Sequence, residues 1–466
     1  MTTENDRKGR VLAAVDREFE NALERLLTLV KIPSISTDPA HARNCRQAAD
    51  WLTDLLTDLG FVAKTHETDG HPVVVGHSGG AHQRMLFYGH YDVQPADPLD
   101  LWVRPPFEAD IIDAPYGKAI HGRGASDDKG QFMTFLEACR AWKQATGTLP
   151  EGLVVMLEGE EECGSISLAP FLEEHQDMLR ADLALVCDTG LHASRQPAIM
   201  TSLRGLLSEE ITITGPAIDL HSGLYGGLAV NPLRVLSSVL ASLHDKANRV
   251  MIPGFYRDVR PTDHTRVETW EMLNFDTGRF LGKVGLAAPV NEEGFSALEA
   301  LWSRPTCEIN GMTGGYTGDG FKTVLPSQAS AKISFRLVAD QDPDHLRERF
   351  RAFVMTQIPS DCTVNFTAYA GEKACTMDTT SPLFEASLEE LNEEWQALPV
   401  MTGSGGSIPV TTMFREILGM NSLLTGFSRG DDAIHSPNEK YSLDNFRKGI
   451  RSWARILSRA EELETL

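Results

Sequence analysis

Three short apolar runs, each leading into side chains that can bind a metal ion, constrain the fold of this chain more than any other feature. The runs at 85–88, 153–157 and 183–186 have the continuous apolar pattern of strands that are buried on both faces. They lead into His90, into the acidic stretch 160–162 and into Asp188. Helical patterns lie between them, and this order predicts an open α/β sheet with a site at the carboxyl ends of its strands.

A fourth group of possible metal ligands follows a glycine turn in the stretch 121–130, which reads HGRGASDDKG. Asp127 and Asp128 stand just before residues whose apolar spacing predicts an amphipathic helix. An acidic pair at this position is also typical of a helix N-cap. The metal-binding interpretation therefore depends on the other strand ends, which offer the same kind of ligand.

Charge and cysteine content narrow the class of protein. The 466 residues include 43 Lys and Arg against 65 Asp and Glu, a formal net charge of −22 at pH 7. Such a chain repels phosphate backbones and anionic lipids, so we expect neither nucleic acid nor a membrane as a partner. Seven cysteines without a C-x-x-C pair argue against a disulfide framework and a cysteine zinc site. Because the N-terminus is polar and no apolar run approaches the ~18 residues of a membrane span, we expect a cytoplasmic enzyme.

The sequence texture changes near residue 207 and changes back near 380. Between these points the chain alternates like half-exposed strands, then shows a charged irregular region at about 255–305, and then a strand–helix–strand pattern. Beyond 380 helices return, with one buried strand at 423–427 and a closing helix at 443–462. We therefore predict a catalytic domain formed by 1–206 and 380–466, interrupted by an inserted α+β domain at 207–379.

The metal-competent residues at the strand ends suit two ions better than one. Two histidines with three carboxylates are too many for one open tetrahedral zinc site. They suit two metals ~3.5–4 Å apart that share a bridging carboxylate and hold a water between them. The candidates from the spacing are His90, Asp127, Glu161 or Glu162, Asp188 and His435.

Neighbouring acidic residues leave alternatives open. Asp92 follows His90 by two positions, so it can hold the imidazole in one tautomer. Adjacent glutamates face different directions, and one can bind metal while the next takes a proton from the water. The sequence does not decide the roles within Glu160, Glu161 and Glu162, or between Asp127 and Asp128.

Seven motifs in order along the chain resemble the aminoacylase–carnosine dipeptidase family of two-zinc exopeptidases, closest to its cytosolic nonspecific dipeptidase branch. They read GHYDVQP, GRGASDDKG, EGEEECGS, DLHSGLYGG, FRLV, GGSIPVT and HSPNEKY. The resemblance covers nearly the whole chain. It implies a zinc-exopeptidase-like α/β domain with a mostly parallel sheet and an inserted lid and dimerisation domain.

The resemblance also implies a role for individual residues. It assigns His90 and Asp188 to one metal, Glu162 and His435 to the other, and Asp127 to both, with a cis peptide between Asp127 and Asp128. Glu161 resembles the general base, with Asp92 beside His90 in a supporting catalytic role. His221 resembles a histidine that reaches the active site of the other subunit, contacts the substrate there and stabilises the oxyanion. Arg336 resembles the residue that holds the substrate carboxylate, with Thr323, Gly406 and Ser407 as further substrate contacts.

These expectations combine into one predicted function with two alternatives. We expect a homodimeric metallo-dipeptidase that uses two divalent ions, zinc first, with manganese or cobalt as alternatives. The substrate is a small peptide with a free carboxylate, and the inserted domain forms the dimer. An N-acyl-amino-acid deacylase would use the same two-metal site. A metal-binding protein that has lost catalysis would keep the ligands but have no need of Glu161.

Overall fold

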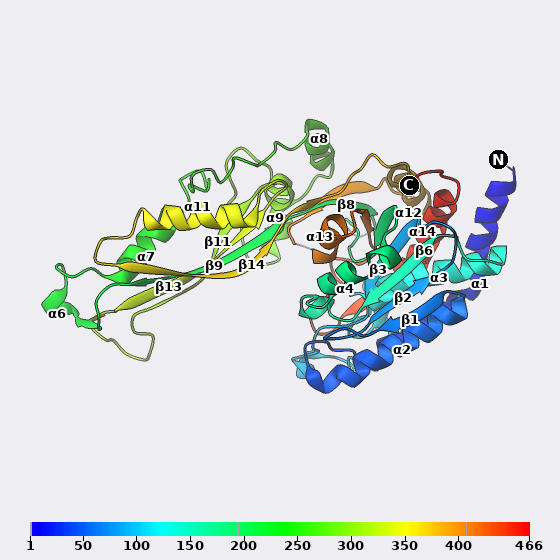
Figure 1. Cartoon of the computed structure of the whole chain (residues 1–466), viewed down its shortest axis with the longest axis horizontal. Helices are drawn as coiled ribbons and strands as arrows, with labels where there is room; N and C mark the ends of the chain where they lie inside the picture. The colour runs from blue at the N-terminus through cyan, green and yellow to red at the C-terminus, as the bar shows by residue number, and fades with distance from the viewer. Residues whose placement is uncertain (1, 193–194, 407) are drawn as a thin grey trace. The chain divides into compact units, whose positions relative to one another are not determined.

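The computed structural model describes residues 2–192, 195–406 and 408–466, and these form two compact units (Figure 1). Unit 1 comprises Met1–Thr201, Met377–Thr402 and Pro409–Leu466, and unit 2 comprises Ser202–Thr376 and Gly403–Ile408. The predicted domain boundaries at 207 and 379 lie a few residues later in the chain than these. The segment 403–408 was predicted to belong to the catalytic domain, whereas in the structure it belongs to unit 2.

The main sheet of unit 1 has a parallel centre and antiparallel edges. Strands β6, β3, β7 and β17 run parallel to one another, which confirms the predicted α/β fold. The antiparallel pairs at either edge were not predicted. In sheet order the strands are β1 (Val62–His66), β2 (Val73–His77), β6 (Leu153–Glu158), β3 (Met85–His90), β7 (Leu183–Val186), β17 (Asn421–Thr425) and β8 (Ala198–Leu203), and β16 (Val400–Ser404) also pairs with β8. The last two residues of β8 belong to unit 2, where they pair with β15 (Cys375–Thr376).

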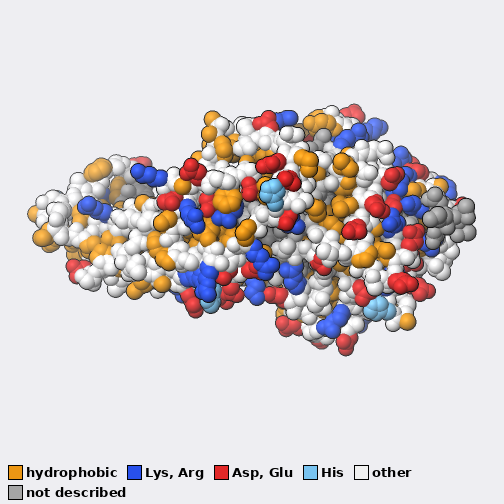
Figure 2. Space-filling view, turned by 90° about the horizontal axis from the view of Figure 1, so that it is seen from above, with side chains coloured by type: hydrophobic (Ala, Val, Ile, Leu, Met, Phe, Trp, Pro, Cys, Tyr) orange, Lys and Arg blue, Asp and Glu red, His pale blue; other side chains and the backbone are white. Residues whose placement is uncertain are grey.

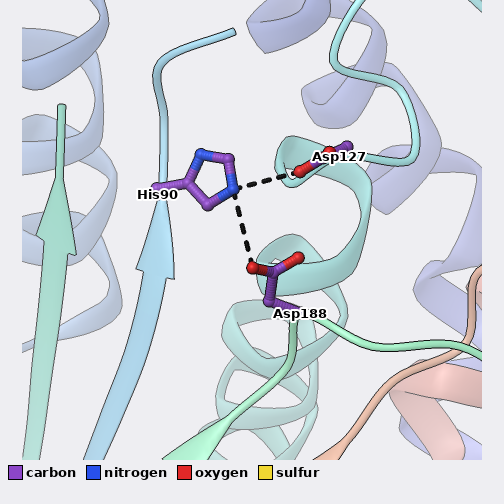
Figure 3. Close-up of side chains that lie close together, drawn as sticks. All are labelled: His90, Asp127 and Asp188. Atoms are coloured by element: carbon purple, nitrogen blue, oxygen red, sulfur yellow. Dashed lines mark hydrogen bonds and ion pairs between the residues drawn. The ribbon is translucent and has the colours of Figure 1, made fainter. Parts of the chain in front are cut away.

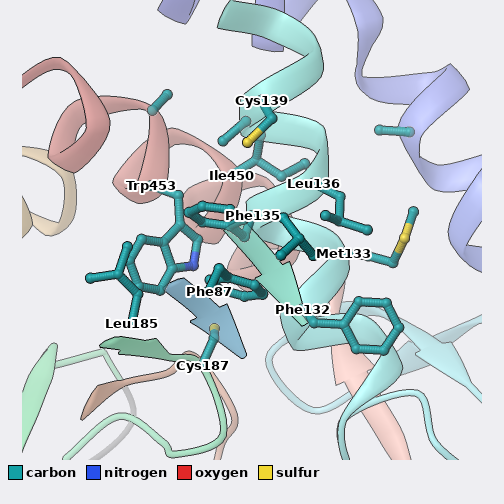
Figure 4. Close-up of a cluster of buried hydrophobic side chains, with 14 of the residues drawn as sticks. Phe87, Phe132, Met133, Phe135, Leu136, Cys139, Leu185, Cys187, Ile450 and Trp453 are labelled. Atoms are coloured by element: carbon teal, nitrogen blue, oxygen red, sulfur yellow. The ribbon is translucent and has the colours of Figure 1, made fainter. Parts of the chain in front are cut away.

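Helices cover both faces of this sheet because its central strands are apolar on both sides. Phe87 on β3 stacks on Phe135 with ring centroids 3.8 Å apart, and Trp453 lies edge-on to Phe135 at 5.4 Å (Figure 4). Tyr88, the next residue along the strand, points to the opposite face and contacts Phe414. On the first face the sheet shares one hydrophobic core with residues of α1 (Thr2–Val30), α2 (Ala42–Leu59), α3 (Lys129–Thr146), α12 (Pro382–Trp395) and α14 (Leu443–Ala460), and Phe414 belongs to α13 (Pro409–Glu416).

Some local elements differ from the sequence-based expectations. The apolar spacing predicts a helix over 16–30, whereas helix α1 begins at Thr2. The sequence after the second apolar run predicts one helix over 167–179. The structure has two, α4 (Leu168–Glu174) and α5 (Gln176–Leu179), because His175 leaves helical geometry and its ring packs on Phe171. The Pro-rich composition of residues 95–115 predicts a loop, but this stretch ends in a strand of a small antiparallel sheet. That sheet is formed by β4 (Asp110–Ala114), β5 (Gly117–His121) and β18 (Lys440–Ser442).

Unit 2 is an antiparallel sheet with helices packed on one face. Burial alternates strictly along β9, as its sequence predicted, and the buried residues join one core with α7 and α11. Asn231 caps α7 by accepting from the Leu233 amide. The sheet order is β11 (Thr306–Gly314), β13 (Gln328–Leu337), β9 (Gly205–Thr214) and β14 (Thr363–Glu372), and the helices are α7 (Pro232–Ala241) and α11 (Pro343–Met355).

Smaller elements complete unit 2. The region expected to be irregular contains three short helices, and strand β11 was not predicted. A two-residue ladder of β10 with β12 precedes the short helix α6. The bounds are α8 (His264–Met272), α9 (Thr277–Gly282), α10 (Ala297–Trp302), β10 (Leu220–His221), β12 (Val324–Leu325) and α6 (Ser222–Tyr225).

Two whole-chain features bear on the expected class. The seven cysteines are all free thiols, and six of them are buried. Among the described residues, none of the helices combines the length and apolar character that crossing a bilayer requires.

Candidate metal centre and active site

The predicted ligands of unit 1 meet at the carboxyl edge of the parallel strands, on one strand end and four short loops or turns. His90 is the last residue of β3, and Asp188 follows β7. Glu162 lies in a single 3-10 turn, Glu161–Cys163, just after β6. Asp127 precedes α3, and His435 lies in the loop before β18. This convergence follows from strand polarity, because parallel strands end at the same edge of a sheet.

The first group of ligand-type side chains is His90, Asp127 and Asp188 (Figure 3). The Nε2 atom of His90 lies 3.1 Å from Oδ1 of Asp127 and 3.9 Å from Oδ2 of Asp188. The imidazole is completely buried, while the two carboxylates keep 13% and 17% of their side-chain surface exposed. The three side chains therefore face a common point from three different loops.

The second group is Asp127, Glu162 and His435. Nε2 of His435 lies 2.9 Å from Oδ2 of Asp127 and 3.2 Å from Oε2 of Glu162. His435 is the most exposed member at 52%, and its backbone φ is +58°. Asp127 thus presents one carboxylate oxygen to each histidine, which is the arrangement that a shared ligand requires.

Asp128 does not act as the helix cap that its position suggested. It stands at the N-cap position of α3, but its side chain makes no capping hydrogen bond. Oδ2 of Asp128 instead accepts from the backbone N–H of His90 at 3.2 Å. The peptide between Asp127 and Asp128 is cis, as the family resemblance implied. Of the two adjacent carboxylates, only Asp127 faces both histidines.

The donor set fits divalent cations. Each group offers one imidazole nitrogen and two carboxylate oxygens, and within each group these atoms lie within 4.8 Å of one another. Ligand atoms of a tetrahedral zinc ion stand about 3.4 Å apart when each is about 2.1 Å from the ion. The measured distances within the two groups, 2.9–3.9 Å, bracket that value.

The electrostatics of the groups also favour a cation. Burial and the nearby charge of Asp127 raise the pKa of Asp188 well above its usual range. Burial and the charge of Asp188 do the same to the pKa of Asp128. Burial would also raise the pKa of Asp127, but hydrogen bonds to His435 and His90 outweigh it and lower that pKa. Crowded buried carboxylates of this kind are stabilised by bound positive charge.

The three consecutive glutamates have three different environments. Glu160 is buried and points away from the ligands, because its two oxygens accept from the backbone N–H groups of His71 and Ser167, both at 2.9 Å. Glu162 belongs to the second group. Burial raises the pKa of Glu161 to about 7, close to the value that suits a general base at neutral pH.

Asp92 supports this turn as well as the histidine. Its carboxylate accepts from the backbone N–H groups of Glu161 at 3.2 Å and Glu162 at 3.0 Å. Nδ1 of His90 lies 3.2 Å from the backbone oxygen of Asp92 and 3.4 Å from its Oδ1. Asp92 therefore links the loops that follow β3 and β6, and one of its oxygens lies near the ring nitrogen as predicted.

Comparison with known proteins identifies the family. Residues 86–459 match the family described as peptidase family M20/M25/M40. The chain belongs to this family. A Cys-Gly metallodipeptidase of Schizosaccharomyces pombe is 29% identical over 459 residues, which cover 95% of this chain and 96% of that protein. A human beta-Ala-His dipeptidase is 28% identical over 82% of this chain and 76% of its own length.

Solved structures of the family give the same result. An M20 family metallo-carboxypeptidase from Sulfolobus solfataricus, Sso-CP2, superposes with a TM-score of 0.80 at 31% identity, covering 95% of this chain and 99% of that one. The di-peptidase Dug1p from Saccharomyces cerevisiae has a TM-score of 0.77 at 26% identity, covering 98% and 99%. The family and fold expected from the sequence motifs are thereby confirmed.

In unit 2, the predicted carboxylate-binding Arg336 lines a cavity of about 720 Å³. Arg204 lines the same cavity, is only 9% exposed, and donates to the backbone oxygens of Gly405, Ala300 and Arg304. Burial and the charge of Arg336 lower the pKa of Arg204 to about 10. The cavity therefore holds two neighbouring guanidinium groups, and Arg204 was not among the predicted residues.

The other predicted substrate contacts lie elsewhere in unit 2. His221 and Thr323 are adjacent, because β10 pairs with β12 and the amide of Ser222 donates to the Thr323 oxygen. Nδ1 of His221 accepts from the Gly223 amide at 3.0 Å, so the ring proton is on Nε2. Gly406 donates its amide to Ser404, and Ser407 lies outside the described residues.

Sequence reasoning missed several residues that contact the predicted ligands. Gln94 donates to Oε2 of Glu162 at 2.8 Å, and Glu439 accepts from the amide of Asp127 at 3.0 Å. Both lie inside motifs that were already recognised, GHYDVQP and HSPNEKY. Their position within those motifs was the available signal, but a polar residue near a ligand in sequence does not reveal which loop it will contact.

Proposed function

We propose that this chain is a metal-dependent dipeptidase that hydrolyses the peptide bond of dipeptides with a free C-terminal carboxylate. The observation that carries the proposal is the pair of ligand groups sharing Asp127, with Glu161 next to one of them. Membership of the M20 family supports it, as do relatives named as a Cys-Gly metallodipeptidase and a beta-Ala-His dipeptidase. The same relatives do not favour the N-acyl-amino-acid deacylase alternative.

The residues of the chain have separate tasks in this proposal. His90 and Asp188 would hold one divalent ion, Glu162 and His435 the other, and Asp127 both, with zinc as the proposed metal. Two such ions, when bound, polarise the peptide carbonyl and lower the pKa of the attacking water. Glu161 takes a proton from that water at its carboxylate and returns it to the leaving amine. Asp92 holds His90 and the Glu161–Glu162 turn in place.

A substrate panel tests this function directly. The metal-loaded protein is assayed with dipeptides, with tripeptides and with N-acetyl amino acids, and metal content is measured on the same sample. We expect turnover of dipeptides, with about two divalent ions per chain. Turnover of the acetylated compounds alone would replace the dipeptidase by the deacylase, and full activity after metal removal would refute the metal mechanism.

A second candidate is a carboxypeptidase that removes one residue from longer peptides. The observation in its favour is the similarity to Sso-CP2, which is named as a metallo-carboxypeptidase. Both functions need Arg336 to bind a free carboxylate, and they differ in what the site accepts on the N-terminal side. Faster cleavage of tripeptides and tetrapeptides than of dipeptides would favour this candidate.

We expect Arg336→Met to remove the preference for a free carboxylate. A lost charge-assisted hydrogen bond costs about 1.5–3 kcal/mol, so KM for dipeptides should rise about 10- to 150-fold. Dipeptide amides, which lack that charge, should show little change. Lys332→Met is the matched control, because Lys332 is an exposed cation four residues earlier on β13. An equal loss for dipeptides and their amides would contradict the proposed contact.

The geometry of unit 2 supports a homodimer. His221 pairs with Val324 just before β13, whereas Arg336 lies near the far end of that strand. From Gln328 to Arg336 the extended strand advances about 27 Å. A dipeptide is far shorter than this, so His221 and Arg336 of one chain cannot both contact it. We propose that the partner subunit supplies the histidine.

Exposed apolar residues near His221 also support the proposed homodimer. Four large side chains around α6 and β12 are 69–90% exposed, and hydrophobic side chains gather at this end of unit 2 in Figure 2. They are Ile218, Leu224, Leu228 and Phe321. Apolar clusters of this kind mark interaction surfaces, and we propose that a second copy of unit 2 covers this one.

A complementation experiment tests the shared site. His221→Ala should lower kcat about 10²- to 10³-fold, the usual cost of one oxyanion donor, without loss of metal. Co-expression with Glu161→Gln should restore about a quarter of wild-type activity, because half of the dimers are mixed and each has one complete site. Absence of restoration would show that His221 does not act across the dimer.

We also propose a cytoplasmic location. The support is that all seven cysteines are free thiols, six of them buried. Proteins of reducing compartments keep their cysteines in this state.

A further inference from the structure

Glu439 is a completely buried carboxylate that contacts the loop carrying the shared ligand. Oε2 accepts from Nη1 of Arg123 at 2.7 Å and from the amide of Gly124 at 2.9 Å. Oε1 accepts from the amides of Ser126 at 2.9 Å and Asp127 at 3.0 Å. Each oxygen thus has two donors, and three of the four are backbone N–H groups of one short loop.

These bonds fix the position of Asp127 through its own backbone. Three amides that converge on one carboxylate form a concave anion-binding turn, here filled by the side chain of Glu439. The amide of Gly122 adds a fourth backbone bond, to the main-chain oxygen of Glu439. The backbone of the loop before α3 therefore surrounds the side chain of Glu439, which lies about 310 residues further along the chain.

Glu439 also anchors the loop that carries His435. It directly precedes β18, which pairs with β5, so one end of the His435 loop is held by a strand. The His435 loop contains three non-glycine residues with positive φ, namely Ala433, His435 and Asn438. Such backbone conformations are costly for L-residues and persist only when surrounding contacts impose them.

We propose that Glu439 is a positioning residue that holds Asp127 and His435 in one rigid frame, so that the affinity for metal depends on it. The inference rests on the metal centre of the proposed function. Glu439 reaches no ligand atom itself, because all its acceptor capacity is used by Arg123 and the backbone amides. Glu439 keeps the two carboxylate oxygens of Asp127 facing both histidines, so the loop need not rearrange when metal binds.

The test is the metal affinity of Glu439→Gln, measured with zinc by competition with a chromogenic chelator. The glutamine amide would present a donor to groups that are themselves donors, and the loop must move. Loss of a residue that orients a ligand typically lowers metal affinity 10–100-fold, and we expect a decrease in this range. The rise in Tm that zinc produces should shrink in parallel.

Glu209→Gln is the matched control. Glu209 is equally buried and ion-paired, to Arg347 at 3.0 Å and to Arg351, but it lies in unit 2 and contacts no predicted ligand. Both variants should lower the Tm of the metal-free protein, and only Glu439→Gln should lower zinc affinity. Wild-type affinity in Glu439→Gln, with a Tm loss like that of the control, would overturn the inference.

A conservative variant keeps the test decisive if the glutamine variant does not fold. Glu439→Asp retains the buried charge but draws the carboxylate back by one methylene, so it should fold and lose affinity to a smaller extent than expected for glutamine. Unchanged affinity in this variant would also overturn the inference. If the wild-type protein itself binds no zinc, the proposed function fails, and that outcome is distinct from a failure of the role of Glu439 alone.

Discussion

Replacing Glu161 by glutamine is expected to lower kcat by ~10²–10⁴ while leaving the metal content unchanged. Glutamine has nearly the same shape but cannot accept the proton of the attacking water. Among the described residues, Glu161 belongs to neither ligand group, so the ions should lose no ligand. Steady-state kinetics with a dipeptide and metal analysis of the same preparation give both quantities.

Glu160→Gln is the control for this experiment. It makes the same chemical change one residue earlier, but the oxygens of Glu160 bind the backbone of His71 and Ser167 rather than facing the ligands. We expect it to lower thermal stability and to keep most of the turnover. Wild-type turnover in Glu161→Gln would show that another group removes the proton, and loss of metal would show that Glu161 is a ligand.

Asp127→Ala is expected to abolish binding of both ions, whereas His435→Ala should abolish only one. The reason is geometric, since one oxygen of Asp127 lies 3.1 Å from His90 and the other 2.9 Å from His435. The loss of affinity should exceed the ~10²-fold that removal of a mere orienting residue costs. Metal content after dialysis, followed by competition with a chelator, measures the stoichiometry of each variant.

The comparison of the two variants decides whether Asp127 is shared. If Asp127→Ala retained one tightly bound ion, Asp127 would serve a single site and the two-ion arrangement would need another bridge. If His435→Ala lost both ions, the second group would be required to build the first. Circular dichroism on each metal-free variant ensures that a lost ion reflects a lost ligand and not an unfolded chain.

Much of the architecture could be predicted because burial leaves a strong pattern. Apolar runs identified the central strands β3, β6 and β7, and alternation identified β9. The antiparallel strands β1 and β2 and strand β11 were not predicted. Strand β1 has no buried residue and β11 is largely exposed, so burial leaves no clear pattern in either. In β2 the apolar run is only three residues long, Val73–Val75, and is followed by a glycine.

The sequence by itself determined the kind of site and the edge of the sheet where it lies. His90, the acidic stretch after β6 and Asp188 all follow parallel strands, and the polarity of such strands brings their ends together whatever the details of packing. Membership of the family was also readable from the motifs, and the match over residues 86–459 confirms it.

Only the tertiary structure decided between neighbouring residues of the same chemical type. It directed Asp127 toward both histidines and Asp128 toward the His90 amide, and it turned Glu160 away from the ligands. It also brought the carboxylate of Glu439 within hydrogen-bond distance of the Asp127 amide. The physical reason is that adjacent carboxylates are identical in charge and reach, and only the backbone of distant loops determines which one faces the ligands.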